Sequence, residues 1–180
     1  IIPHKPDIVV TGINYGENVG LGITISGTVG AAMEAASMGI LALAVSLQTE
    51  TQYHLSHSED INFSTAGYFT AYFAKLLLEK KFPHDVDLLK VEVPNYATPE
   101  TEWQVGRLSR SRYYDPVPAQ RASWEELGPI SYKHSEGLEK ESEDTDAYIL
   151  REKKMVAVTP LNLDMTAPVV LSEFEKSLRK

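Results

Sequence analysis

Short apolar runs bounded by glycine or proline predict three strands, at residues 8–10, 40–46 and 86–93. The first run is β-branched and apolar without alternation, which is typical of a strand covered on both faces in a parallel sheet. A helical stretch that ends at Gly39 separates the first two runs. This strand–helix–strand order implies a parallel pair with a right-handed connection, so the pattern predicts an α/β fold.

Two further stretches have a helical pattern. Residues 60–81 carry large apolar side chains at three- and four-residue spacing and end in two lysines, which complement the helix dipole. An aromatic stripe of this kind indicates a core-facing helix. Residues 172–180 predict a short C-terminal helix with Ser172 as its cap and a basic end.

Two hairpins are also predicted. Residues 146–151 and 155–160 flank a polar turn at 152–154, which is a hairpin signal. Residues 113–116 and 131–134 lie in a proline-rich stretch without helical period, and we interpret them as extended, exposed arms or hairpin strands. A change of composition at Trp103 suggests a boundary within one structural domain, between an α/β core at 1–102 and a segment at 103–180 with the arm, a hairpin and the last helix.

The stretch from Trp103 to Glu143 is the most basic part of the chain and is rich in aromatic residues. Arginine together with tyrosine suits a subunit interface and phosphate contact alike. A solvated hairpin is the alternative. The arginines are Arg107, Arg110, Arg112 and Arg121.

A glycine-rich loop follows the first strand and ends at Ser26-Gly27-Thr28, just before the helix-forming residues 31–36. Unpaired N–H groups and two hydroxyls at a helix N-terminus favour an anion. The alternative is that Ser26 only caps the helix, because the spacing matches neither the dinucleotide-binding pattern nor the P-loop. Asn14 lies at the carboxyl end of the strand, where open α/β sheets bind ligands, and its amide oxygen suits Mg²⁺ or Mn²⁺.

Composition narrows the classes of function. The 180 residues are 43% hydrophobic, which is enough for one domain with a sizeable core, and contain no cysteine, which excludes disulfides and thiolate metal sites. The net charge of −8 argues against a protein that coats nucleic acid. The sequence contains no apolar run long enough to cross a membrane, and its start does not resemble a signal peptide, so we expect cytoplasmic residence.

Two groups of polar residues could be mistaken for metal sites, but a solvated segment explains each of them. His54 and His57 are three residues apart and could share a metal, but no third ligand lies near them in a zinc-site pattern, and a solvated loop explains them as well. Asp144 and Asp146 belong to an acidic run, which by default is a solvated segment.

Residues 6–20, 26–34 and 39–46 closely resemble the SurE family, and residues 144–148 through 159–161 form a second similar stretch. The resemblance implies a SurE-like three-layer fold with a mostly parallel, Rossmann-like sheet, a protruding β-hairpin arm and a C-terminal helix. It also implies a phosphatase that acts on nucleoside monophosphates and depends on a divalent ion, Mg²⁺ or Mn²⁺. Ser26, Gly27 and Thr28 would hold the phosphate and Asn14 the metal. Family members are dimers or tetramers with swapped arms, so we expect a homo-oligomer.

One departure from the family pattern concerns the metal. In the family an Asp-Asp pair and a serine supply the other ligands, but the sequence contains no Asn-Asp-Asp-Gly stretch, so only Asn14 carries over. We expect the catalytic carboxylates to lie upstream of Ile1. A non-catalytic nucleotide-binding or assembly module is the alternative. A serine hydrolase is disfavoured, because Ser26 lacks the Gly-x-Ser-x-Gly elbow.

Overall fold

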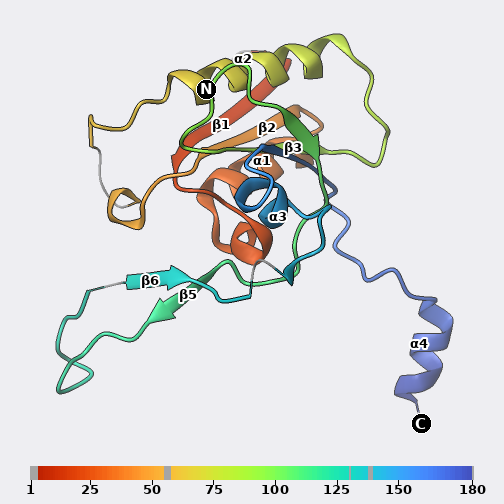
Figure 1. Cartoon of the computed structure of the whole chain (residues 1–180). Coiled ribbons are helices and arrows are strands. Elements are labelled where there is room, and N and C mark those ends of the chain that lie inside the picture. The colour runs from red at the N-terminus through yellow and green to blue at the C-terminus, as the bar shows by residue number, and fades with distance from the viewer. Residues whose placement is uncertain (1–3, 55–57, 130, 138–139, 180) are drawn as a thin grey trace.

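A computed structural model describes residues 4–54, 58–129, 131–137 and 140–179, and shows helices packed on a five-stranded sheet (Figure 1). The strand order is β1-β2-β3-β7-β4, in which β1, β2 and β3 are parallel, β7 is antiparallel to β3, and β4 is parallel to β7. The predicted α/β fold with a mostly parallel sheet is confirmed. The strands are β1 (Ile8–Tyr15), β2 (Leu41–Leu47), β3 (Leu88–Val93), β4 (Trp103–Val105) and β7 (Val156–Leu161).

Helices cover both faces of this sheet. The helix α2 (Ser64–Glu79), which confirms the aromatic-stripe helix, packs Phe69 and Phe73 against one face. The helix α1 (Gly27–Ser37) packs small side chains against the other face, next to α3 (Asp146–Arg151) (Figure 1). Successive residues of β2 and β3 therefore alternate between two cores, as strand geometry requires. Two short 3₁₀ turns, η1 (Gly20–Ile25) and η2 (Thr51–Tyr53), lie in the loops that follow β1 and β2.

The first strand differs from its prediction. It continues through Asn14 to Tyr15, and in the described part of the chain it forms an edge of the sheet, with Val10 40% exposed rather than covered on both faces. Gly12 lies inside the strand and not in a loop. Its φ is +107°, and a Cβ atom there would lie 2.2 Å from the carbonyl oxygen of Val45. Glycine is required at this position because β2 approaches so closely.

The prediction of a hairpin at residues 146–160 is wrong. Its first half is the helix α3, which begins after Thr145, whose Oγ1 accepts a hydrogen bond from the N–H of Tyr148. Its second half is the strand β7, which pairs with β3 and β4 instead. The cap and the burial of Ile149 and Leu150 outweigh the short polar turn. The C-terminal helix is confirmed as α4 (Leu171–Leu178), but it follows Val170 without a side-chain cap, so Ser172 is not its cap.

The arm is confirmed as a two-stranded antiparallel hairpin, β5 (Tyr114–Val117) with β6 (Ser131–His134). In Figure 1 this hairpin and α4 both extend away from the sheet. The sequence predicts exposed strands in the arm, but the aromatic residues between Trp103 and Glu143 differ in their exposure. Trp103 belongs to the main sheet, and Tyr113 is buried, whereas Trp124 is 86% exposed. Among the described residues, no helix is long and apolar enough to span a membrane.

Candidate phosphate-binding loop and its buried support

Asn14 lies near the carboxyl end of β1, in register with Ser46 of β2. Its side-chain nitrogen donates hydrogen bonds to the carbonyl oxygens of Tyr15 (3.2 Å) and Gly16 (2.8 Å). These two bonds, both made by the side-chain nitrogen, fix the orientation of the Asn14 amide group. Both bonds leave the amide oxygen available, and this is the atom that a hard cation would take.

The first turn of α1 provides the candidate anion site. Ser26 Oγ accepts a hydrogen bond from the N–H of Val29 at 3.1 Å, so the capping role of Ser26 is confirmed. The N–H groups of the first turn have no acceptor within a helix, which leaves those of Gly27 and Thr28 suited to an anion. Thr11 Oγ1 donates to the carbonyl oxygen of Thr28 at 2.8 Å. This bond ties the start of α1 to β1, three residues before Asn14.

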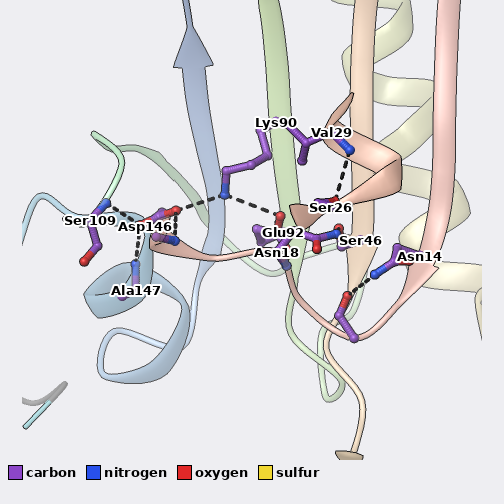
Figure 2. A network of polar contacts seen from close by, with 12 residues as sticks. Asn14, Asn18, Ser26, Val29, Ser46, Lys90, Glu92, Ser109, Asp146 and Ala147 are labelled. Carbon is purple, nitrogen blue, oxygen red and sulfur yellow. Dashed lines mark hydrogen bonds and ion pairs between the residues drawn. The ribbon is translucent and has the colours of Figure 1, made fainter. Parts of the chain in front are cut away.

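Two buried carboxylates hold the loop between β1 and α1 (Figure 2). Glu92 Oε2 accepts a hydrogen bond from the N–H of Asn18 at 2.9 Å, and Asp146 Oδ2 accepts one from the N–H of Gly20 at 3.0 Å. The side chain of Asn18 donates to Ser46 Oγ at 2.9 Å. The backbone N–H groups of Asn18 and Gly20 are therefore bonded to side chains of β3 and α3, and only the side chain of Asn18 bonds to β2.

The ammonium of Lys90 joins these two carboxylates. Its Nζ atom lies 2.9 Å from Asp146 Oδ2 and 3.4 Å from Glu92 Oε1, and all three side chains are fully buried. Burial alone would lower the pKa of Lys90, but the charges of Asp146 and Glu92 hold it above its usual value. Burial raises the pKa of Glu92 to about 7, although the charge of Lys90 opposes the change. Lys90 therefore depends on the two carboxylates to remain charged inside the protein.

A third carboxylate, Glu17, connects the same loop to the arm. Its Oε1 accepts a hydrogen bond from the hydroxyl of Tyr113 at 2.9 Å and lies 3.5 Å from Nε2 of His134. Burial would raise the pKa of Glu17, but the hydrogen bonds from His134, its own backbone and Tyr113 together hold it below the usual range. Among the described residues, Glu17 Oε2 has no hydrogen-bond partner.

The acidic residues Asp144 and Asp146 differ in burial, and His54 is engaged in hydrogen bonds. Asp144 is exposed and pairs with Arg107 at 3.1 Å, but the interpretation of Asp146 as solvated is wrong, since it is fully buried. His54 has both ring nitrogens engaged, with Nδ1 2.7 Å from the hydroxyl of Tyr132 and Nε2 3.1 Å from the carbonyl oxygen of Thr49. His57 lies outside the described residues. Within the described part of the chain, no three His, Asp or Glu side chains gather in a way that could hold a metal.

Sequence reasoning brought Asn14, Ser26, Gly27 and Thr28 into one loop region but missed the residues that support it. One available signal was β3 itself, where Lys90 and Glu92 occupy alternate positions of an otherwise apolar strand and so share one face. The missed residues are Glu17, Asn18, Ser46, Lys90, Glu92 and Asp146.

The chain is similar in sequence and structure to known proteins of one family. The model of the family described as Survival protein SurE matches residues 1–115. The 5'-nucleotidase SurE of Thermococcus kodakarensis is 40% identical over 176 residues, covering 96% of this chain and 66% of its own length. That of Methanocaldococcus jannaschii is also 40% identical, covering 100% and 66%. The crystal structure of the SurE protein from Aquifex aeolicus superposes with a TM-score of 0.72 at 31% identity, covering 98% of this chain and 67% of that one. The chain thus spans just under two thirds of the length of these curated relatives.

Proposed function

Because the chain belongs to the SurE family, we propose that it is the phosphate-binding part of a metal-dependent phosphatase that hydrolyses nucleoside monophosphates to nucleoside and orthophosphate. The observation that carries this proposal is the position of the first turn of α1. The bond from Thr11 to the carbonyl oxygen of Thr28 holds that turn against β1, which also carries Asn14. The relatives from Thermococcus and Methanocaldococcus are named 5'-nucleotidases, which supports the substrate class.

In this proposal Ser26, Gly27 and Thr28 hold the phosphate. The N–H groups at the start of α1 would donate hydrogen bonds to phosphoryl oxygens, the partial positive charge there would attract them, and the Thr28 hydroxyl would donate to one of them. Such donors stabilise the transition state more than the ground state when charge shifts onto the oxygens that they contact. Local donors matter here because the chain as a whole carries a net charge of −8 and repels anions.

The metal fits these residues only in part. The Asn14 oxygen has the chemistry that Mg²⁺ or Mn²⁺ prefers, but these ions also need carboxylates, and the described residues contain no group of three or more His, Asp or Glu side chains that could hold a metal. We propose that the remaining ligands and the catalytic carboxylates come from outside the described residues.

A phosphatase assay tests this function. The complete gene product should release orthophosphate from nucleoside 5'- or 3'-monophosphates when Mg²⁺ or Mn²⁺ is present, and EDTA should abolish the release. The 180-residue chain alone should show no appreciable turnover, and its metal-stimulated turnover would overturn our ligand assignment. If the complete gene product binds AMP but does not hydrolyse it, the alternative of a non-catalytic nucleotide-binding module is favoured.

We also propose that the protein is a homo-oligomer joined through the arm. The arm projects from the sheet and exposes Trp124 and Leu127 near its tip, so a second copy could cover these side chains.

A further inference from the structure

Lys90 has an unusual position for a lysine. It lies on the central strand β3, its side chain is fully buried, and its charge is compensated by Glu92 on the same strand and by Asp146, 56 residues later at the start of α3. A buried ion pair of this kind stabilises a fold little, because the cost of removing the charges from water offsets their attraction. Apolar side chains at all three positions would serve the core as well, so the triad calls for another explanation.

The two carboxylates explain what Lys90 does. Glu92 directs Oε1 to the ammonium and Oε2 to the N–H of Asn18, while Asp146 Oδ2 accepts from both Lys90 and the N–H of Gly20. The other oxygen of Asp146 accepts hydrogen bonds from the N–H groups of Ser109 and Ala147. In Figure 2 the ammonium lies between the two carboxylates, with the loop on their far side. Lys90 thus fixes the orientation of both acceptors that hold the loop.

The loop leads directly to the candidate phosphate site. Gly20 begins η1, which ends at Ile25, immediately before the Ser26 cap of α1. Gly20 has a φ of +55°, and a Cβ atom there would lie 2.7 Å from the carbonyl oxygen of Ser111, so the loop packs tightly at this point. A shift at residues 18–20 would therefore be passed through one short 3₁₀ turn to the N–H groups at 26–28.

We propose that Lys90 is a positioning residue for phosphate binding: through Glu92 and Asp146 it holds the backbone of residues 18–20 and thereby sets the place of the Ser26-Gly27-Thr28 turn. The part of this inference that concerns phosphate rests on the proposed function, whereas the part that concerns the loop does not.

Two substitutions on neighbouring positions of β3 separate positioning from stability. Lys90→Met removes the charge, and Leu89→Ala removes packing on the opposite face of the sheet, against α2. Both should destabilise the chain, because one breaks a buried ion pair and the other truncates a core leucine. Amide hydrogen exchange, followed by NMR, should show that Lys90→Met speeds exchange at Asn18 and Gly20 about tenfold more than at core amides of β2. Leu89→Ala should increase the exchange rates of Asn18 and Gly20 by the same factor as those of the core amides. Equal behaviour of the two variants would overturn the positioning role.

A titration with AMP and Mg²⁺, followed through the amide signals of residues 26–28, tests the connection to phosphate. Lys90→Met should weaken AMP binding by about tenfold, whereas Leu89→Ala should change it less than about twofold. The double variant Lys90→Met/Glu92→Gln removes one charge of each sign and keeps an oxygen that can accept from Asn18, so it should recover much of the lost affinity. It also replaces the single variant if that variant does not fold. Unchanged affinity in Lys90→Met overturns the inference. No AMP response in the wild-type chain refutes the phosphate site itself, and the exchange data still decide whether Lys90 holds the loop.

Discussion

The hydroxyl of Tyr113 donates a hydrogen bond of 2.9 Å to the carboxylate of Glu17, 96 residues earlier in the chain, and both side chains are buried. Tyr113 directly precedes β5, and His134 at the end of β6 lies 3.5 Å from the same oxygen. The base of the arm is therefore fastened to the glycine-rich loop by one carboxylate. Any movement of the arm acts on a residue next to Asn18, which Glu92 holds.

We predict that Tyr113→Phe destabilises the chain. The substitution removes only the hydroxyl and leaves the buried Glu17 carboxylate without its shortest hydrogen bond, which costs about 1–3 kcal/mol. Urea denaturation measures the free energy of unfolding. Tyr96→Phe is the matched control, because Tyr96 is 51% exposed and its hydroxyl is outside this cluster. Equal stability of the two variants would show that the bond between Tyr113 and Glu17 contributes nothing.

The stability of the chain should also depend on pH through Glu92. Burial raises the pKa of Glu92 from 4.5 to about 7, against the opposing charge of Lys90. A carboxyl group with a raised pKa holds its proton more tightly in the folded state, so its contribution is complete below pH 4.5 and is lost as the pH rises through 7. Glu92→Gln cannot ionise and is free of this loss.

We therefore expect the free energy of unfolding of Glu92→Gln, relative to wild type, to increase between pH 5 and pH 8, by at most about 3 kcal/mol. Urea denaturation at one-unit pH intervals measures the difference. Groups that do not contact Glu92 are the same in both proteins and cancel in the comparison. Parallel pH curves for the two proteins would contradict a raised pKa of Glu92.

The sequence pattern predicts where β3 lies but not what its polar side chains do. Periodicity depends on neighbouring positions, and it assigned residues 86–93 to a strand, which the structure confirms as Leu88–Val93. The partners of Lys90 and Glu92 come from Asp146 and Asn18, 56 and 74 residues away, so no local pattern contains them. Only the presence of two charges on one face of an apolar strand hinted at a buried network.

The acidic run at residues 139–146 also shows that a local pattern does not contain long-range partners. A cluster of acidic residues is usually solvated, and Asp144 follows that rule. Asp146 does not, because Thr145 starts a helix at this point and the turn directs Asp146 toward Lys90. By contrast, the motif residues Asn14 and Ser26 could be assigned to a strand end and a helix start, since both positions follow from short-range signals.

We predict that Thr28→Val in the complete gene product lowers kcat/KM by the equivalent of about 1–3 kcal/mol of transition-state stabilisation. The variant is nearly isosteric and loses one hydroxyl. The contact with Thr11 should persist, because Thr11 donates to the backbone carbonyl of Thr28. Thr24→Val is the matched control, since its hydroxyl is exposed and bonds only to the carbonyl oxygen of Leu21. Circular dichroism checks folding, and an unchanged kcat/KM would remove the Thr28 hydroxyl from the site.

The last prediction concerns assembly, and the structure changes the reason for it. The aromatic residues from Trp103 to Glu143 suit a subunit interface by composition, but Tyr113 is buried within its own chain. The most exposed apolar side chains of the segment are Trp124, which is 86% exposed, and Leu127, which is 98% exposed, and both lie in the loop between the two strands of the arm. Apolar side chains presented on a projecting hairpin are typical of a surface that is covered by a second copy.

We predict that the protein is at least a dimer at micromolar concentration and that Trp124→Ser/Leu127→Ser converts it to a monomer, as measured by light scattering. Removing the whole arm would be a poor test, because Ser109 and Tyr113 at its base bind Asp146 and Glu17. The tip substitutions leave these contacts intact, so a change of mass reports on the interface alone. The helix α4 offers a second exposed apolar face, and Phe174→Ser/Leu178→Ser is therefore the matched variant. If the α4 variant becomes monomeric while the tip variant stays a dimer, the interface lies on α4 instead, and a monomeric wild-type protein would contradict assembly through the arm.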